Sequence, residues 1–273
     1  MKVIVTRPLL EANAWVKLLR EKSIDAVALP LIQICEVSDT KPIQHAWTLL
    51  HQYHSVMFVS RNAVRYFFEL NNSLDEVKYR KFAIDNIVNK SNKLRFWVTG
   101  PGTKDALIEL GVTADAIDAP LLDAAQFDSE ALWHRVQSQV KAGDKVLIVR
   151  GSSLTANGNE SALMNGRPWL ADQLTAAGAL VDTVVSYQRS APLFDASEMA
   201  LMAQASGDSS VWLLSSSEAV ANLKSMLGLN WSKARAIATH PRIAHAAREA
   251  GFGVVYESRP TLADVAASIE SLK

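Results

Sequence analysis

In the stretch Val56-Met57-Phe58-Val59-Ser60-Arg61-Asn62 a short apolar run stops at a hydroxyl and an arginine and continues directly into a helical pattern, which is typical of a strand that leads into a helix in an α/β fold. Junctions of the same kind recur at 3–8, 96–103, 146–151, 211–217 and 236–241. Each puts backbone N–H groups, the positive end of a helix dipole and a hydroxyl cap at the carboxyl end of a buried strand, where open α/β sheets bind ligands. The pattern predicts a protein equipped to hold anions.

The composition limits the class of protein. A chain of 273 residues, 49% of them hydrophobic, can bury a large core and exceeds the usual size of a single one, which predicts two domains. Lys plus Arg and Asp plus Glu are equal at 28 each, whereas nucleic-acid binders and polybasic membrane proteins need a net positive face. We therefore expect no nucleic-acid partner, no membrane partner, and an anion site that is local.

Cysteine content and hydropathy indicate the compartment. The one cysteine, Cys35, excludes an intramolecular disulfide and a Cys-rich metal site, and it fits a reducing environment. The amino terminus begins with a strand pattern rather than an export signal, and no window approaches the apolar length of a membrane span. These features predict a cytoplasmic protein.

Strands and helices alternate along the whole chain, which is the pattern of parallel sheets covered on both faces. Strands are expected at 2–6, 26–30, 55–59, 95–98, 115–118, 145–149, 181–187, 210–214, 236–238 and 253–256. Helices are expected at 9–22, 39–51, 61–70, 102–110, 128–140, 167–177, 195–204, 216–227, 241–250 and 261–272.

The distribution of these strands predicts the domains. The middle of the chain has enough strands for a complete doubly wound sheet, and the two ends together supply a second sheet if the middle domain is inserted into it. We predict two doubly wound, parallel-sheet (flavodoxin-like) α/β domains. Domain 1 comprises 1–33 and 191–273, inserted domain 2 comprises 38–183, and 34–37 with 184–190 form a two-stranded linker. Residues 71–92 and 152–166 are expected to be insertions without elements of their own.

A series of short motifs along the chain resembles the motifs of the uroporphyrinogen-III synthases. Each motif alone has little specificity for the family. Their order and spacing along the whole chain identify the family. The resemblance implies two α/β domains, one inserted in the other, joined by a two-stranded linker. The motifs are Val5-Thr6-Arg7-Pro8, Leu29-Pro30-Leu31-Ile32, Val59-Ser60-Arg61-Asn62-Ala63-Val64, the run 98–103, Leu147-Ile148-Val149-Arg150-Gly151, Tyr187-Gln188-Arg189, Ser215-Ser216 and Ile237-Ala238-Thr239.

The resemblance also implies a reaction. Hydroxymethylbilane, a linear tetrapyrrole that bears carboxylates on every ring, loses water and closes to uroporphyrinogen III with its last ring inverted, through a spiro-pyrrolenine. This is hydro-lyase chemistry of heme and tetrapyrrole biosynthesis. Because the same bilane closes unaided to the type I isomer, the enzyme must steer geometry more than it must lower a high barrier, which favours shaped binding.

Residue roles follow from the same resemblance. Tyr187 is expected to donate a proton to the leaving hydroxyl, and the alternative is that it packs the hinge between domains. The hydroxyls of Ser60, Thr103, Ser215 and Thr239 are explained equally well as helix caps or as ligand contacts. One hydroxyl can serve in both roles. Substrate contacts are expected from Thr6, Arg7, Ser60, Arg61, Asn62, Gly100, Pro101, Thr103, Arg150, Gly151, Ser215, Ser216 and Thr239.

Other chemistries find no support in the sequence. The run Gly100-Pro101-Gly102-Thr103 lacks the Gly-Lys-Ser/Thr ending of a phosphate-binding loop, and no strand leads into a full Gly-x-Gly-x-x-Gly turn. The histidine pairs at 51 and 54 and at 240 and 245 have no clustered carboxylate or cysteine, so we expect no metal and no cofactor.

One rival function stays open at this point. A non-catalytic two-domain protein could close a cleft on a small anionic ligand, although such receptors usually have an export signal. The resemblance implies instead an enzyme with hydroxymethylbilane as its small-molecule substrate. We expect a monomer that makes at most transient contact with a hydroxymethylbilane synthase.

Overall fold

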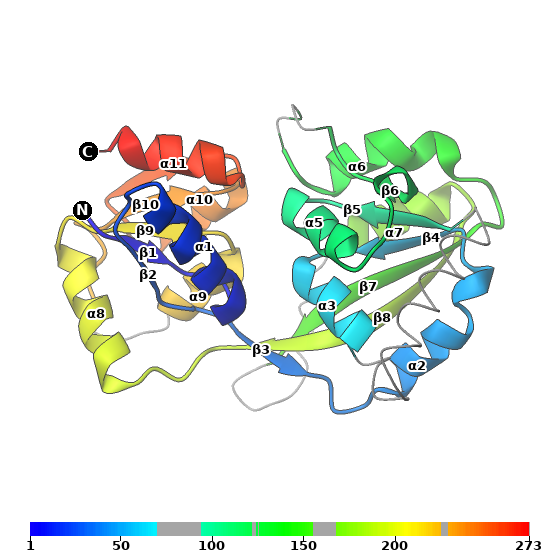
Figure 1. Cartoon of the computed structure of the whole chain (residues 1–273), viewed down its shortest axis with the longest axis horizontal. Helices are drawn as coiled ribbons and strands as arrows, with labels where there is room; N and C mark the ends of the chain where they lie inside the picture. The colour runs from blue at the N-terminus through cyan, green and yellow to red at the C-terminus, as the bar shows by residue number, and fades with distance from the viewer. Residues whose placement is uncertain (70–93, 122–123, 125, 155–167, 225–228, 273) are drawn as a thin grey trace. The chain divides into compact units, whose positions relative to one another are not determined.

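The computed structural model describes residues 1–69, 94–121, 124, 126–154, 168–224 and 229–272. The chain divides into two compact units: unit 1 comprises Met1–Ile34 and Ser190–Lys273, and unit 2 comprises Cys35–Arg189. Each unit has one sheet with helices against it (Figure 1). The expected insertion at 71–92, and 155–166 of the second one, lie outside the described residues.

Unit 1 contains a five-stranded, fully parallel sheet. Its order is β11-β10-β9-β1-β2, which becomes 2-1-3-4-5 when the strands are numbered within the unit, the flavodoxin-like order. The strands are β1 (Val3–Val5), β2 (Ala26–Ala28), β9 (Val211–Leu214), β10 (Arg235–Ala238) and β11 (Val254–Glu257).

Helices cover both faces of this sheet. Val3 and Val5 pack with α1 (Leu9–Glu21) and α11 (Leu262–Glu270), whereas Ile4 points to the opposite face. That face is covered by α8 (Ala196–Gly207), α9 (Ser217–Lys224) and α10 (Pro241–Glu249). Because side chains alternate along a strand and both faces are covered, the central strands read as continuous apolar runs.

Unit 2 contains a six-stranded sheet in the order β3-β8-β7-β4-β5-β6. Strands β4 to β8 pair in parallel, and their order within the unit is 3-2-1-4-5. The flavodoxin-like order expected for both sheets is therefore replaced here by the other doubly wound order, because the chain adds both β5 and β6 before it crosses to β7. The strands are β3 (Gln33–Glu36), β4 (Ser55–Phe58), β5 (Arg95–Val98), β6 (Ile117–Asp118), β7 (Lys145–Ser153) and β8 (Leu180–Ser190).

The two faces of this second sheet are also covered. Met57 and Ile148 pack with α6 (Ser129–Val136) and α7 (Pro168–Ala176). On the opposite face Phe58 meets Phe67 of α3 (Arg61–Glu69), with ring centroids 5.5 Å apart. Phe67 stacks in turn on Trp47 of α2 (Lys41–Thr48), and α5 (Pro101–Glu109) packs beside α3.

Several elements differ in length from the sequence expectation. β7 continues to Ser153, so Ser152 and Ser153 are buried strand residues rather than the start of a loop, because they keep pairing with Gln188 and Arg189 of β8. The strand expected at 115–118 begins with the 3-10 turn Ala114–Ala116. The helices expected at 39–51 and 128–140 also end in 3-10 turns, at Leu50–Gln52 and Gln137–Gln139.

The expected linker segments are continuous with the sheet of unit 2. β3 lies beside β8 at the edge of that sheet, and β8 runs without interruption from Leu180 to Ser190. The boundary between the compact units falls between Ile34 and Cys35 and between Arg189 and Ser190. The division into domains at 33, 38, 183 and 191, with a linker of 34–37 and 184–190, stays a prediction.

We predict that Gly253→Ala destabilises unit 1. A Cβ atom at Gly253 would meet the carbonyl oxygen of Ser232 and lie 2.9 Å from the carbonyl carbon, and backbone cannot move away cheaply. Overpacking of this kind costs about 1–3 kcal/mol, so the urea midpoint of unfolding should fall. Gly207→Ala is the matched control, because a Cβ atom there meets nothing within 4 Å. Equal midpoints for the two variants would contradict the steric argument.

Candidate functional site

The strand order singles out one position in each sheet. Open parallel sheets bind ligands outside the carboxyl ends of their strands, where the order of strands reverses. In unit 1 the reversal lies between β1 and β9, which lead into Thr6 and Ser215. In unit 2 it lies between β4 and β7, which bring Ser60 and Gly151 to the same edge.

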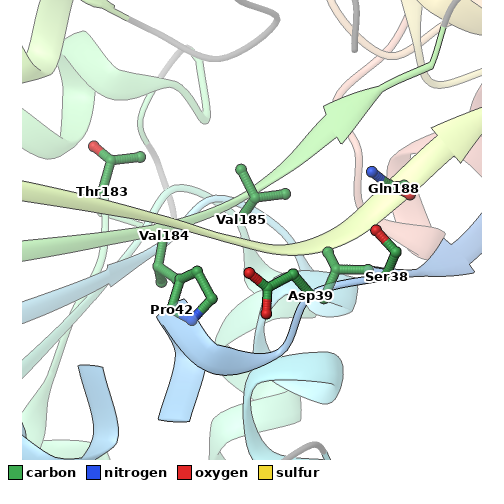
Figure 2. Close-up of a pocket in the computed structure, with 8 residues that line it drawn as sticks. Ser38, Asp39, Pro42, Thr183, Val184, Val185 and Gln188 are labelled. Atoms are coloured by element: carbon green, nitrogen blue, oxygen red, sulfur yellow. The ribbon is translucent and has the colours of Figure 1, made fainter. Parts of the chain in front are cut away.

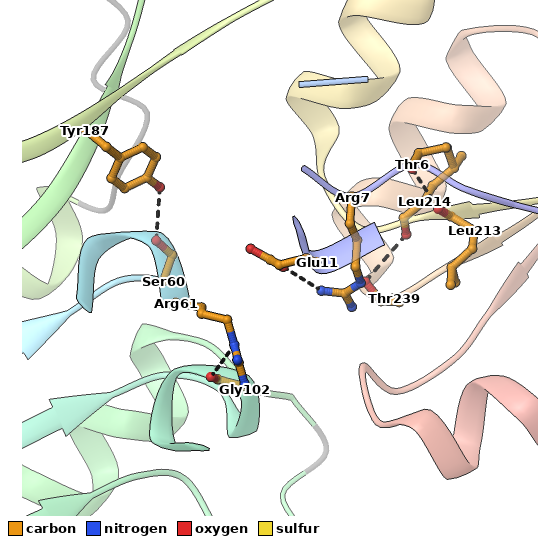
Figure 3. A network of polar contacts seen from close by, with 10 residues as sticks. All are labelled: Thr6, Arg7, Glu11, Ser60, Arg61, Gly102, Tyr187, Leu213, Leu214 and Thr239. Carbon is orange, nitrogen blue, oxygen red and sulfur yellow. Dashed lines mark hydrogen bonds and ion pairs between the residues drawn. The ribbon is translucent and has the colours of Figure 1, made fainter. Parts of the chain in front are cut away.

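Two threonine hydroxyls at the strand ends of unit 1 donate hydrogen bonds to neighbouring strands. Thr6 is 1% exposed and donates its hydroxyl to the carbonyl oxygen of Leu213 at 2.7 Å (Figure 3). Thr239 is also buried and donates to the carbonyl oxygen of Leu214 at 3.5 Å. Both hydroxyl protons are therefore used within the sheet, and the backbone at these strand ends is fixed in place.

Two further features of unit 1 lie at the same strand ends. The Arg7 guanidinium is 3.4 Å from Glu11 and stacks over the ring of Trp15 at 4.3 Å, which holds a positive charge at the start of α1. Ser216 accepts a hydrogen bond from the backbone N–H of Glu218 at 3.2 Å, whereas Ser215 is half-buried beside it. Ser216 thus acts as a cap for α9.

In unit 2 the first turns of α3 and α5 are joined. Arg61 Nε donates to the carbonyl oxygen of Gly102 at 3.1 Å (Figure 3). Its Nη1 lies 3.4 Å from a Glu109 carboxylate oxygen. Gly100 is the N-cap of α5 and Pro101 its first residue, the position where proline suits a helix. Thr103 is buried in that turn, and Asn62 is half-buried on α3.

Tyr187 is buried within unit 2. It is 2% exposed, and its phenol oxygen lies 3.0 Å from the Ser60 hydroxyl (Figure 3). Its ring packs directly on the backbone of Gly151, where a Cβ atom would lie 2.6 Å from Cε2 and 2.8 Å from Cε1. Glycine is required here because no side chain fits between β7 and the ring.

A β-bulge determines which face of the sheet Tyr187 occupies. Arg150 pairs with Val185 and Gly151 with Tyr187, so Ser186 is an extra residue in β8. In an unbulged strand that kept Ser186, Tyr187 would pair one position further along, with Ser152, and would alternate to the other face of the sheet, away from α3. The bulge turns the ring toward α3, and Ser186 Oγ donates to the carbonyl oxygen of Ala63 at 3.3 Å.

Arg150 is not brought to Tyr187. Successive residues of a strand point to opposite faces, so Arg150 lies on the other side of β7 from the Gly151 face. It is half-buried and contacts the carbonyl oxygen of Gly151 at 3.4 Å.

Sequence reasoning missed the aromatic neighbour of Tyr187. Tyr66 of α3 stacks on the Tyr187 ring with centroids 6.0 Å apart and an interplanar angle of 24°. Burial is the largest cause that raises the pKa of the Tyr66 phenol above its usual value, so this ring stays neutral. The spacing of Ser60, Ala63 and Tyr66 at every third position of one helix face is the signal that could have identified it.

A pocket of about 310 Å³ opens elsewhere in unit 2 (Figure 2). It is lined by Val37, Ser38, Asp39, Pro42, Thr183, Val184, Val185 and Gln188. None of the predicted site residues lines it, and its one ionisable side chain is the acidic Asp39, so it is unsuited to a polycarboxylate.

The described ranges contain neither a metal-binding cluster nor a membrane-spanning helix. Those ranges hold no group of three or more His, Cys, Asp or Glu side chains placed to bind a metal ion. Among the helices of the same ranges, none has both the length and the apolarity needed to cross a membrane.

Comparisons with known proteins agree on one family. The family model described as uroporphyrinogen-III synthase HemD matches residues 13–267. A curated relative, the porphyrin biosynthesis protein HemD of Ruminiclostridium josui, is 26% identical over 147 residues, or 54% of this chain. That match spans 26% of the relative's own length.

Solved structures show the same fold. A uroporphyrinogen-III synthetase from Helicobacter pylori matches 100% of this chain and 100% of its own, with a TM-score of 0.57 and 16% identity. A mutant uroporphyrinogen III synthase from the extremely thermophilic bacterium Thermus thermophilus matches 100% and 98%, with a TM-score of 0.56 and 16% identity. The predicted α/β fold class is confirmed.

We predict that Gly151→Ala displaces the Tyr187 ring. The added methyl would overlap the ring, so we expect the Ser60–Tyr187 contact to break. The free energy of unfolding should fall by about 1–3 kcal/mol, and the urea midpoint should fall with it. The Tyr187 side-chain resonances, assigned with Tyr187→Phe, should shift. Gly102→Ala is the control, because its Cβ atom would meet only Arg61 Nε, at 3.9 Å. Unchanged Tyr187 resonances in Gly151→Ala would contradict the packing argument.

Proposed function

Because the chain belongs to the uroporphyrinogen-III synthase family, we propose that it converts hydroxymethylbilane to uroporphyrinogen III. The observation that carries this proposal is the family match over 13–267, which confirms the resemblance stated from the sequence motifs. That match favours an enzyme of tetrapyrrole biosynthesis over a non-catalytic binding protein.

The proposed reaction is a dehydrating cyclisation of the hydro-lyase type. The terminal hydroxyl accepts a proton and leaves as water, while the adjacent pyrrole nitrogen supplies the electron pair that forms an azafulvene. The substituted α-carbon of the last ring then attacks to give a spiro-pyrrolenine. Fragmentation and reclosure invert that ring, and loss of a proton restores aromaticity.

We propose Tyr187 as the proton donor to the leaving hydroxyl. Its phenol lies beside Ser60 at the strand-order reversal of unit 2, where ligands of such sheets bind. A phenol is a weak acid, but hydrogen bonding to a hydroxyl that departs from an electron-rich pyrrole needs only a weak one. Tyr187 also packs β8 against α3, and the two roles are compatible.

We propose that substrate carboxylates bind at the strand-end loops, through backbone amides, hydroxyls and arginines. Arg7 and Arg61 each lie 3.4 Å from a carboxylate of their own chain. Exposed ion pairs such as Arg61–Glu109 contribute only about 0–1 kcal/mol, so a substrate carboxylate can replace Glu109 at little cost. The residues of these loops are Thr6, Arg7, Ser60, Arg61, Asn62, Gly100, Pro101, Thr103, Arg150, Gly151, Ser215, Ser216 and Thr239. Pro101 has no N–H, and Thr6 and Thr239 already donate within the sheet, so these three would shape the loops rather than donate to a carboxylate.

We further propose that the protein acts as a monomer in the cytoplasm. Its substrate closes spontaneously to the wrong isomer, so the enzyme that makes hydroxymethylbilane must release it nearby. Transient contact with that synthase would shorten the exposure of the free bilane to water.

The test is direct. Hydroxymethylbilane is generated in place by its synthase, the products are oxidised, and the porphyrin isomers are separated. An excess of type III over the no-enzyme control supports the proposal. Type I alone, from well-folded protein, would refute it.

We predict that Tyr187→Phe lowers the rate of type III formation by about 10²-fold, the lower end of the usual contribution of a general acid. The fold should persist, because only one hydroxyl is removed. Tyr256→Phe is the matched control, since Tyr256 is exposed on β11 of unit 1. A Tyr187→Phe variant as active as Tyr256→Phe would remove the phenol from the mechanism.

We also predict that activity needs no added cofactor. Chelators, zinc, nicotinamide and flavin should each leave the rate of type III formation unchanged. A binding site that holds the bilane in one geometry and one weak acid suffice for the proposed chemistry. Loss of activity on exhaustive chelation, restored by a metal ion, would contradict this prediction.

A further inference from the structure

The Ser60 hydroxyl takes part in two hydrogen bonds. Its oxygen accepts the backbone N–H of Ala63 at 3.1 Å, which caps the first turn of α3. The same oxygen lies 3.0 Å from the Tyr187 phenol oxygen, and either atom could be the donor of that second bond. Which of them donates determines where the phenol proton points.

The position of Ser60 at the helix start favours Ser60 as the donor. A serine hydroxyl has one hydrogen and two lone pairs, and here one lone pair already faces a backbone N–H. The positive end of the α3 dipole draws electron density from that oxygen, and hydrogen bonds in a chain polarise one another. Both effects make the Ser60 O–H a better donor and its oxygen a poorer second acceptor.

The surroundings of Tyr187 hold its ring in one place. The ring is restrained by the close approach of Gly151, by the stacking of Tyr66 and by the bulge at Ser186. A phenol O–H prefers the plane of its ring, so it has two orientations, one toward Ser60 and one away from it. With the ring fixed, the hydrogen bond to Ser60 selects between them.

We propose that Ser60 is a positioning residue whose hydroxyl donates to the Tyr187 oxygen and thereby directs the phenol proton away from α3, toward the leaving hydroxyl of the substrate. This rests on the proposed role of Tyr187. In the opposite arrangement the phenol proton would be held by Ser60, and its transfer would first require that bond to break.

Four substitutions at Ser60 separate this role from helix capping. Ser60→Thr and Ser60→Asn retain a cap and a donor, since the amide can cap with its oxygen and donate with its nitrogen. Ser60→Asp retains the cap, but an ionised carboxylate only accepts, so it must draw the phenol proton toward α3. Ser60→Ala lacks both functions and reports the combined loss.

We expect wild-type-like type III formation from Ser60→Thr, a modest loss from Ser60→Asn, and a loss of about tenfold or more from Ser60→Asp, the effect of misdirecting one hydrogen bond. Urea midpoints of the three capped variants should agree. Equal activity of Ser60→Asn and Ser60→Asp would overturn the proposal, because charge-neutral and acceptor-only caps would then be equivalent.

A spectroscopic measurement adds a readout that a purely structural role would not move. The Cζ resonance of ¹³C-labelled Tyr187, assigned with Tyr187→Phe, is followed as a function of pH. Ser60→Asp should raise the pKa of this phenol relative to Ser60→Asn, since the phenol then donates to a carboxylate. Identical titrations in the two variants would contradict the hydrogen bond between residue 60 and the phenol, on which the proposal depends.

The outcomes distinguish this inference from the function on which it rests. Wild-type protein that yields only type I product refutes the proposed function. Active wild-type protein, impaired Tyr187→Phe and fully active Ser60→Asp refute the role of Ser60 alone.

Discussion

Parallel pairing of the central strands determines where the strand-end loops of both sheets lie. In unit 1 β1 pairs with β9, and in unit 2 β4 pairs with β7, each at the point where the strand order reverses. The chain leaves these paired strands in opposite directions, so the following helices do not cover the shared edge. Thr6 and Ser215 in one sheet, and Ser60 and Gly151 in the other, meet at such edges for this reason.

The second sheet adds a local irregularity to this regular plan. The bulge accommodates Ser186 as an extra residue, so Tyr187 pairs with Gly151 on the face that α3 covers, and Gly151 leaves room for the ring. Bulges are rare in parallel pairs and tend to occur where a side chain must be aimed at a site. Here the bulge joins β8 to the start of α3 through two hydrogen-bonded contacts, from Ser186 and from Tyr187.

This construction suits a reaction that needs control of geometry. Under the proposed function, a fixed phenol and a set of strand-end donors would hold a flexible, polyanionic chain in one arrangement without a large net charge, which agrees with the equal numbers of acidic and basic residues. Arg61 forms an exposed and therefore weak ion pair with Glu109, so its charge can be redirected to a ligand.

The alternation of strands and helices, the α/β class and the strand-end loops could be predicted from the sequence, because apolar periodicity and capping residues are local signals. The family was identified from a resemblance of motifs along the chain, and the family model confirms it. The tertiary structure decided the order 3-2-1-4-5 of unit 2, the extension of β7 to Ser153 and the bulge at Ser186. It also showed that Tyr66 stacks on Tyr187 and that Arg150 lies on the opposite face. These features depend on which strand pairs with which, and in what register, and no local pattern of residues encodes that choice.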